Sequence, residues 1–119
     1  MTGTMGVHLL ANIFGCPVEV LNYEADVARL LNEVVVDAKL TKVSESHFQF
    51  DPVGVTSVIL LAESHISIHT WPEHGSAAVD IFCCSGEEAA NRAFKALLER
   101  FKPEKHDCQI IKRWPIVWS

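Results

Sequence analysis

Four strand-like segments follow one another in the middle of the chain, and this feature constrains the fold more than any other. They lie at residues 41–50, 55–61, 66–71 and 76–84, and the last is rich in β-branched and aromatic residues towards its end. Because the connections between them are too short for a crossover helix, neighbouring strands must run antiparallel. Two further strands are predicted at residues 7–14 and 106–114.

Two amphipathic helices are predicted, one before and one after the four strands. Asn22 could cap the first, while Ser85 and Glu88 give the second a Ser-x-x-Glu capping-box pattern, and Pro103 ends it. Their apolar positions recur at helical spacing: Val27, Leu30, Leu31, Val34, Val35 and Ala38 in the first, and Ala90, Ala93, Phe94, Leu97, Leu98 and Phe101 in the second.

The predicted order is β-α-β-β-β-β-α-β within a single domain of residues 1–119. Each helix has one apolar stripe, so both are expected to cover the same face of a mainly antiparallel sheet. The predicted fold class is therefore α+β, a two-layer sandwich. The other face of the sheet also needs protection from water, which favours a homodimer or a higher homo-oligomer.

Composition excludes several classes of protein. The hydrophobic fraction of 49% excludes a disordered chain, and no apolar stretch is long enough to span a bilayer. A net charge of −5 argues against binding to nucleic acid. The first residues lack a basic region followed by an apolar stretch, and the four cysteines lack the spacing of a disulfide scaffold. We therefore expect a cytoplasmic protein with free thiols and no membrane partner.

Residues 63–73 interrupt the apolar pattern with a carboxylate, hydroxyls and imidazoles. Functional sites often carry polar side chains at positions where core packing alone would favour apolar ones, so this segment is a candidate functional site. Ser64 lies in a predicted turn of residues 62–65. A serine in a strained turn can attack the preceding carbonyl carbon through Oγ and convert the amide into an ester; elimination and hydrolysis then leave a pyruvoyl group. Position alone also allows Ser64 to be an ordinary turn residue.

The segment LAESHISIHTWPE, residues 61–73, resembles the self-processing segment of the prokaryotic S-adenosylmethionine decarboxylases. The similarity extends to residues 50–56 and 75–84, and more weakly to residues 5–10. Together these stretches cover most of the chain to about Phe101, with a matching length and strand order. The near-match at the reactive centre is highly specific.

The resemblance implies autocatalytic cleavage of the Glu63–Ser64 bond into a β chain of residues 1–63 and an α chain of residues 64–119. Ser64 would become a pyruvoyl cofactor, which forms a Schiff base with the amine of S-adenosylmethionine and accepts the electrons left as CO2 departs. The product would be the aminopropyl donor for spermidine synthesis, and no metal is expected.

Three further residues match family positions that handle protons. His69 matches the residue that assists processing by proton transfer, and Thr56 takes the place of a processing hydroxyl. Cys84 matches the acid that protonates the decarboxylated product. The chemistry of these residues is suitable. A thiol with an ordinary pKa of about 8.5 still carries its proton at neutral pH and can donate it, and an imidazole has an ordinary pKa close to neutral pH.

The resemblance also implies three substrate-binding residues. Phe50 is expected to stack on the adenine, together with Trp71. Glu73 is expected to hold the ribose hydroxyls. Without the resemblance, both aromatic residues would be interpreted as core or interface residues, and Glu73 as a solvated turn carboxylate.

Ser64 and His69 are five residues apart, so a regular strand would point them to opposite faces of the sheet. Either the chain turns at Ser64, or His69 serves the neighbouring protomer. The resemblance favours a site shared across a homodimer. Ser64 and Cys84 would come from one subunit, and Thr56, His69 and Glu73 from the other.

Two alternatives belong to other functional classes. His65, His69 and His74, with paired cysteines nearby, could suggest a metal-binding module. However, a His-x-x-x-His pair is useful on a helix, and this segment has the pattern of a strand. An inactive, non-catalytic paralogue is the second alternative, and the presence of Ser64, His69 and Cys84 argues against it.

A third alternative stays within the family. Pyruvoyl-dependent relatives can act on other amino acids, such as ornithine or arginine. This chain departs from the common family pattern at Asn12, Ser76 and Cys83, and these changes could alter the substrate pocket. Phe50, Trp71 and Glu73 favour the nucleoside-containing substrate.

Overall fold

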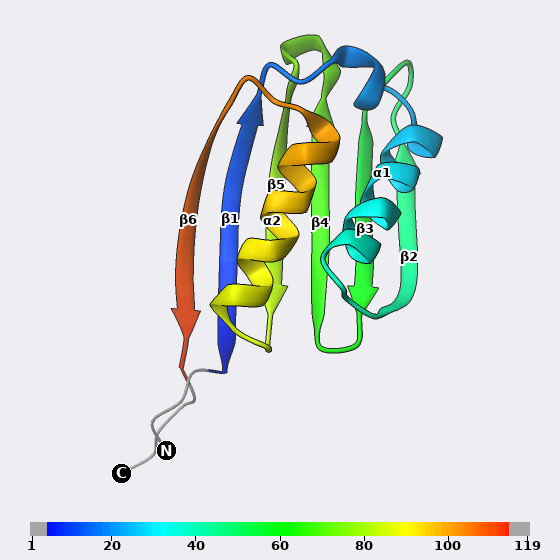
Figure 1. The fold of residues 1–119 in the computed structure, drawn as a ribbon. Coiled ribbons are helices and arrows are strands. Elements are labelled where there is room, and N and C mark those ends of the chain that lie inside the picture. Colours follow the sequence, from blue (N-terminus) through cyan, green and yellow to red (C-terminus); the bar gives the residue numbers. More distant parts are fainter. Residues whose placement is uncertain (1–4, 115–119) are drawn as a thin grey trace.

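The computed structural model describes residues 5–114, which form one six-stranded sheet covered on one face by two α-helices (Figure 1). This confirms the predicted α+β sandwich and the order of its elements. Short 3₁₀ helices, η1 (Val18–Val20) and η2 (Pro72–His74), follow β1 and β4. The other elements are β1 (Gly6–Phe14), α1 (Glu24–Asp37), β2 (Lys42–Gln49), β3 (Val55–Leu61), β4 (Ser64–Trp71), β5 (Ser76–Cys83), α2 (Glu87–Phe101) and β6 (Lys105–Arg113).

The sheet has the order β2-β3-β4-β5-β1-β6, and every neighbouring pair is antiparallel. β3 and β4 form a hairpin in which Leu61 lies opposite Ser64, so the loop contains only residues 62 and 63. The predicted turn of residues 62–65 is therefore wrong. Ser64 and His65 already pair with both β3 and β5, which makes Ser64 the first residue of a strand.

The core lies between the sheet and the two helices. Alternate residues of the four inner strands point towards the helices and are buried, as the period-two geometry of a strand requires. The predicted apolar stripes are confirmed: all of their residues are buried except Leu98, which is partly buried. Each large apolar side chain contributes roughly 1.5–3 kcal/mol by leaving water. The largest fully buried ones include Phe101, Leu9, Ile13, Leu31, Ile59, Ile66, Ile68, Ile81 and Leu97.

The first residues of α1 are capped from a distant strand. The helix has Tyr23 as its N-cap, not the predicted Asn22, and no side-chain cap bond comes from the N-cap itself. Instead, Gln49 Oε1 accepts a hydrogen bond from the Glu24 N–H at 2.6 Å. Gln49 Nε2 also donates to the Asn22 carbonyl at 3.0 Å. A tertiary contact thus replaces the local cap.

The ends of α2 differ from the prediction as well. Its N-cap is Gly86, with φ of 109° and no side-chain cap bond, so the predicted capping box of Ser85 and Glu88 is not formed. The helix ends at Phe101, and Lys102 takes a left-handed conformation with φ of 51°. Pro103 therefore follows the helix without being its immediate end.

The second face of the sheet carries no helix within residues 5–114 (Figure 1). Alternation places large apolar side chains on this open face, including Phe48, Leu60 and Ile111, which are 60%, 47% and 41% exposed. Exposed apolar side chains on a sheet face that no helix covers are typical of an interface. Among the described residues, neither helix has the length and apolar run needed to cross a bilayer.

Gly54, between β2 and β3, is expected to tolerate no side chain. Its φ is +111°, its N–H donates to the Asn22 carbonyl at 2.9 Å, and its carbonyl accepts from the Phe50 N–H at 2.8 Å. We expect Gly54→Ala to lower the free energy of unfolding by about 1–3 kcal/mol in urea titrations. Ser46→Ala, on the exposed strand β2, should change it by less than about 0.5 kcal/mol. Equal urea midpoints for Gly54→Ala and Ser46→Ala would contradict the claim that the backbone at residue 54 requires glycine.

Candidate active site

Ser64 opens β4 directly after the hairpin loop, and its side chain points to the helix-covered face. It pairs with Leu61 of β3 and Cys83 of β5, both of which are buried. Ser64 itself is 9% exposed. The register is set by the apolar residues that follow, since Ile66 and Ile68 must occupy the same face to join the core.

The peptide bond between Glu63 and Ser64 is anchored to the end of β5. The Glu63 carbonyl accepts a hydrogen bond from the Cys84 N–H at 3.2 Å. Such a donor polarises the carbonyl and stabilises negative charge that develops on its oxygen. This amide is therefore held where a nucleophile could attack its carbon.

The Ser64 hydroxyl has a thiol as its neighbour on the helix-covered face. Ser64 and Cys83 lie directly opposite each other on β4 and β5, and both are buried. Burial raises the pKa of the Cys83 thiol. The raised pKa favours the uncharged thiol at Cys83, so this side chain is not suited to act as a base towards Ser64.

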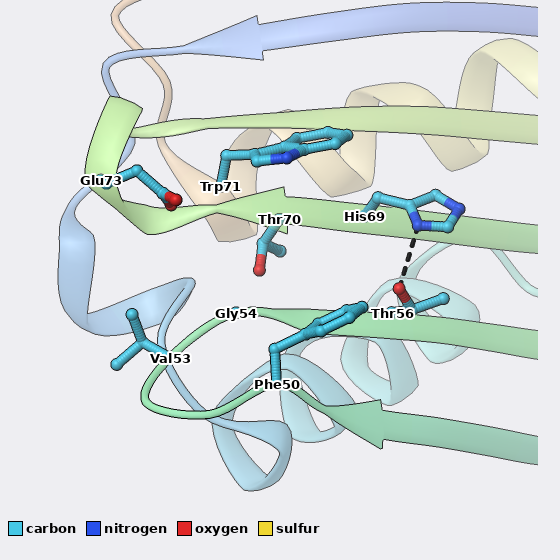
Figure 2. Close-up of a pocket in the computed structure, with 8 residues that line it drawn as sticks. All are labelled: Phe50, Val53, Gly54, Thr56, His69, Thr70, Trp71 and Glu73. Carbon is cyan, nitrogen blue, oxygen red and sulfur yellow. Dashed lines mark hydrogen bonds between the residues drawn. The ribbon is translucent and has the colours of Figure 1, made fainter.

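A second group of polar side chains lies at the opposite end of the same two strands. Thr56 of β3 is directly across from His69 of β4, and Thr56 Oγ1 lies 3.0 Å from His69 Nδ1 (Figure 2). Both side chains are on the open face of the sheet. The contact fixes the imidazole through Nδ1, so Nε2 is the ring nitrogen that it leaves for proton transfer.

This second group lines a pocket of about 240 Å³. Phe50 borders it from the loop after β2, and Trp71 from the end of β4 (Figure 2). The two aromatic side chains are 47% and 45% exposed, which is high for rings of their size. Glu73, in η2, supplies a carboxylate at the same end. The pocket combines aromatic faces with hydrogen-bonding groups, as nucleoside sites do.

The two groups cannot meet within one protomer. β4 runs unbroken from Ser64 to Trp71, so Ser64 and His69 lie on opposite faces and about 16 Å apart along the strand. The alternative in which the chain turns at Ser64 is therefore excluded. The structure brings Glu63, Ser64 and Cys84 together at one end of the sheet. It gathers the other predicted residues, Phe50, Thr56, His69, Trp71 and Glu73, at the opposite end.

The other two histidines considered as metal ligands, His65 and His74, have different neighbours from His69. His65 stacks on Phe82, with ring centroids 5.8 Å apart, and His74 is exposed in η2. Among residues 5–114, no three or more His, Cys, Asp or Glu side chains converge as a metal site would require.

Several residues of the site were not identified from sequence. Val53, Gly54 and Thr70 line the pocket, and Cys83 lies directly opposite Ser64 on the neighbouring strand, with both residues buried. Alternation along β5 could have identified Cys83, because only one of two adjacent residues can share a face with Ser64. The contribution of Cys84 through its backbone N–H has no signal in the sequence.

Known proteins closely resemble this chain. A sequence model of the S-adenosylmethionine decarboxylase family matches residues 7–114. An S-adenosylmethionine decarboxylase proenzyme of Sulfurihydrogenibium sp. is 45% identical over 113 residues, covering 95% of this chain and 85% of the relative. The proenzyme of Archaeoglobus fulgidus is 44% identical over 109 residues, covering 92% and 97%. The crystal structure of the adenosylmethionine decarboxylase of Aquifex aeolicus superposes with a TM-score of 0.91 at 39% identity, covering 99% of this chain and 98% of that one.

The four cysteines should react unequally with an alkylating reagent. Cys84 and Cys108 are exposed, whereas Cys16 and Cys83 are buried, and burial raises the pKa of Cys16 to about 11 and also raises that of Cys83. We expect iodoacetamide at pH 8 to label the two exposed thiols in the folded protein and all four in urea, as read by peptide mass spectrometry. Cys108→Ala should remove one native label. Labelling of Cys83 before Cys84 would contradict the structure.

Proposed function

The chain belongs to the S-adenosylmethionine decarboxylase family, and from this premise we propose that it releases CO2 from S-adenosylmethionine by means of a pyruvoyl group made from Ser64. The product is the aminopropyl donor for spermidine synthesis. The observation that carries the proposal is the anchored Glu63–Ser64 amide, whose carbonyl accepts the Cys84 N–H at 3.2 Å.

Processing begins with attack by Ser64 Oγ on the carbonyl carbon of Glu63. The Glu63 oxygen becomes negatively charged, and the Cys84 N–H that already binds it stabilises this charge. One donor of this kind typically lowers the barrier by about 3–4 kcal/mol. The C–N bond then breaks, the nitrogen takes a proton, and an ester joins Glu63 to Ser64 Oγ.

Elimination follows from the ester. A base removes the Cα proton of Ser64, and the Cβ–Oγ bond breaks, which frees Glu63 as a carboxylate. The dehydroalanine left at position 64 takes up water and releases ammonia, and the α chain then starts with a pyruvoyl group. When formed, this group supplies a ketone that condenses with the substrate amine and accepts the electron pair released with CO2.

We propose that His69 is the base that removes the Cα proton of residue 64. The side chain of Ser64 lies on the helix-covered side of the sheet. His69 occupies the open side but is about 16 Å away in the same protomer. The partner's His69 therefore serves as the base in this proposal, with its ring held by the partner's Thr56.

A two-fold homodimer through the open face satisfies this requirement. An isologous contact between antiparallel faces sets the hairpin end of one sheet against the pocket end of the other. The open face exposes apolar side chains such as Phe48 and Leu60, and such a contact would remove them from water. Each dimer then holds two equivalent sites, each built from both subunits.

The pocket residues are proposed to bind S-adenosylmethionine. The exposed faces of Phe50 and Trp71 suit the adenine, and Glu73 suits the ribose hydroxyls. Cys84 is exposed at the end of β5, beside residue 64, and is proposed to protonate the product after CO2 leaves. The names of the relatives do not favour ornithine or arginine as the substrate.

Replacing the proposed nucleophile should block cleavage completely. Ser64→Ala removes Oγ, so the purified protein should run as one chain of 119 residues without decarboxylase activity. Wild type should give two chains that divide between Glu63 and Ser64, with the α chain blocked by pyruvoyl in mass spectra. Ser67→Ala, on the same strand but on the open face, is the control and should still be cleaved. Cleavage of Ser64→Ala would exclude the serine mechanism.

Replacing the proposed acid should separate processing from catalysis. Cys84→Ala keeps the backbone N–H that binds the Glu63 carbonyl, so cleavage should persist. The rate of CO2 release should fall by about 10²–10⁴, as expected for the loss of a general acid. Cys108→Ala, an exposed thiol on β6, is the control. Wild-type kcat for Cys84→Ala would remove Cys84 from the catalytic step.

A further inference from the structure

A small basic pocket lies on the helix-covered side of the β3–β4 hairpin. It has a volume of about 130 Å³, and its lining includes both residues of the proposed cleavage site, Glu63 and Ser64. Two cationic residues, Lys39 and Arg92, line the same pocket. Glu63 is the only acidic residue among the residues that line it.

The fold places both cationic residues next to the end of α1. Arg92 donates from Nε to the Ala38 carbonyl at the end of α1, at 3.2 Å. Lys39 follows that carbonyl in a left-handed conformation with φ of 60°. A left-handed backbone is unfavourable for a lysine, and here it directs the chain from α1 past the hairpin. The nearby Asp37 is already paired with Arg100 at 2.8 Å.

The proposed processing changes the charge beside this pocket. The Glu63–Ser64 amide is neutral, whereas elimination leaves Glu63 with a new α-carboxylate. Ordinary hydrolysis would also create an ammonium group that balances this charge. Here the nitrogen leaves as ammonia, and the pyruvoyl terminus is uncharged. Cleavage therefore adds one uncompensated negative charge at the hairpin.

We propose that Lys39 and Arg92 form a carboxylate-binding site that takes up the new C-terminus of the β chain after cleavage. This inference rests on the proposed function and extends it, since it assigns the cations to the product of processing. The site would hold Glu63 on the helix-covered side and keep it away from the open side, where substrate enters.

The test compares cleaved and uncleaved protein. Lys39→Gln is made in the wild-type background and in Ser64→Ala, where no new carboxylate forms. The variant should lower the melting temperature of the cleaved protein by about 2–5 °C and leave that of the uncleaved protein unchanged. Arg92→Gln should show the same difference between backgrounds. Lys102→Gln is the matched control, because Lys102 is also left-handed at a helix end but does not line this pocket.

Two results would overturn the inference. The first leaves the proposed function intact, whereas the second also overturns the proposed cleavage. Equal losses in melting temperature in both backgrounds, with normal cleavage of wild type, would overturn the carboxylate site alone. An intact wild-type chain in the mass spectrum of the same samples would overturn the proposed cleavage and the site together. The difference between backgrounds should also shrink in 1 M NaCl, because salt screens exposed charges.

Discussion

The alternation of side chains along β4 is the constraint on which the rest of the site depends. Ile66 and Ile68 must enter the core, so Ser64 shares their face and His69 does not. A strand that satisfied the core could not bring both reactive groups to one place. The site is therefore divided into a hairpin half and a pocket half, at opposite ends of the sheet (Figure 1). Two copies of the chain can reunite these halves through the open face.

The hairpin half is built mainly from backbone. A two-residue loop fixes the Glu63–Ser64 amide, and the Cys84 N–H at the end of β5 meets its carbonyl. Cys83 lies opposite Ser64, and Lys39 and Arg92 line the pocket beside the proposed cleavage site. Sheet pairing places Glu63, Ser64, Cys83 and Cys84 together, so the fold alone assembles the surroundings of the proposed cleavage site.

Much of the fold could be predicted because its signals are local. Helical spacing identified the buried stripes of α1 and α2. The spacing of Ser64 and His69 left two possibilities, a turn at Ser64 or a site shared between protomers, and only the family resemblance favoured the second. Two of the wrong predictions concern contacts between distant residues. Gln49 of β2 caps α1 in place of Asn22, and pairing with β5 turns Ser64 from a loop residue into a strand residue. The Cys84 N–H escaped notice because every residue but proline carries the same donor.

The most direct test of the divided site is complementation between two inactive subunits. Ser64→Ala and His69→Ala are produced together with different tags, and mixed dimers are purified through both tags. In a mixed dimer, one site combines Ser64 with the partner's His69 and is intact. The account predicts a pyruvoyl-blocked α chain from the His69→Ala subunit in mixed dimers and none from either variant alone. Absence of that α chain from purified mixed dimers would contradict it.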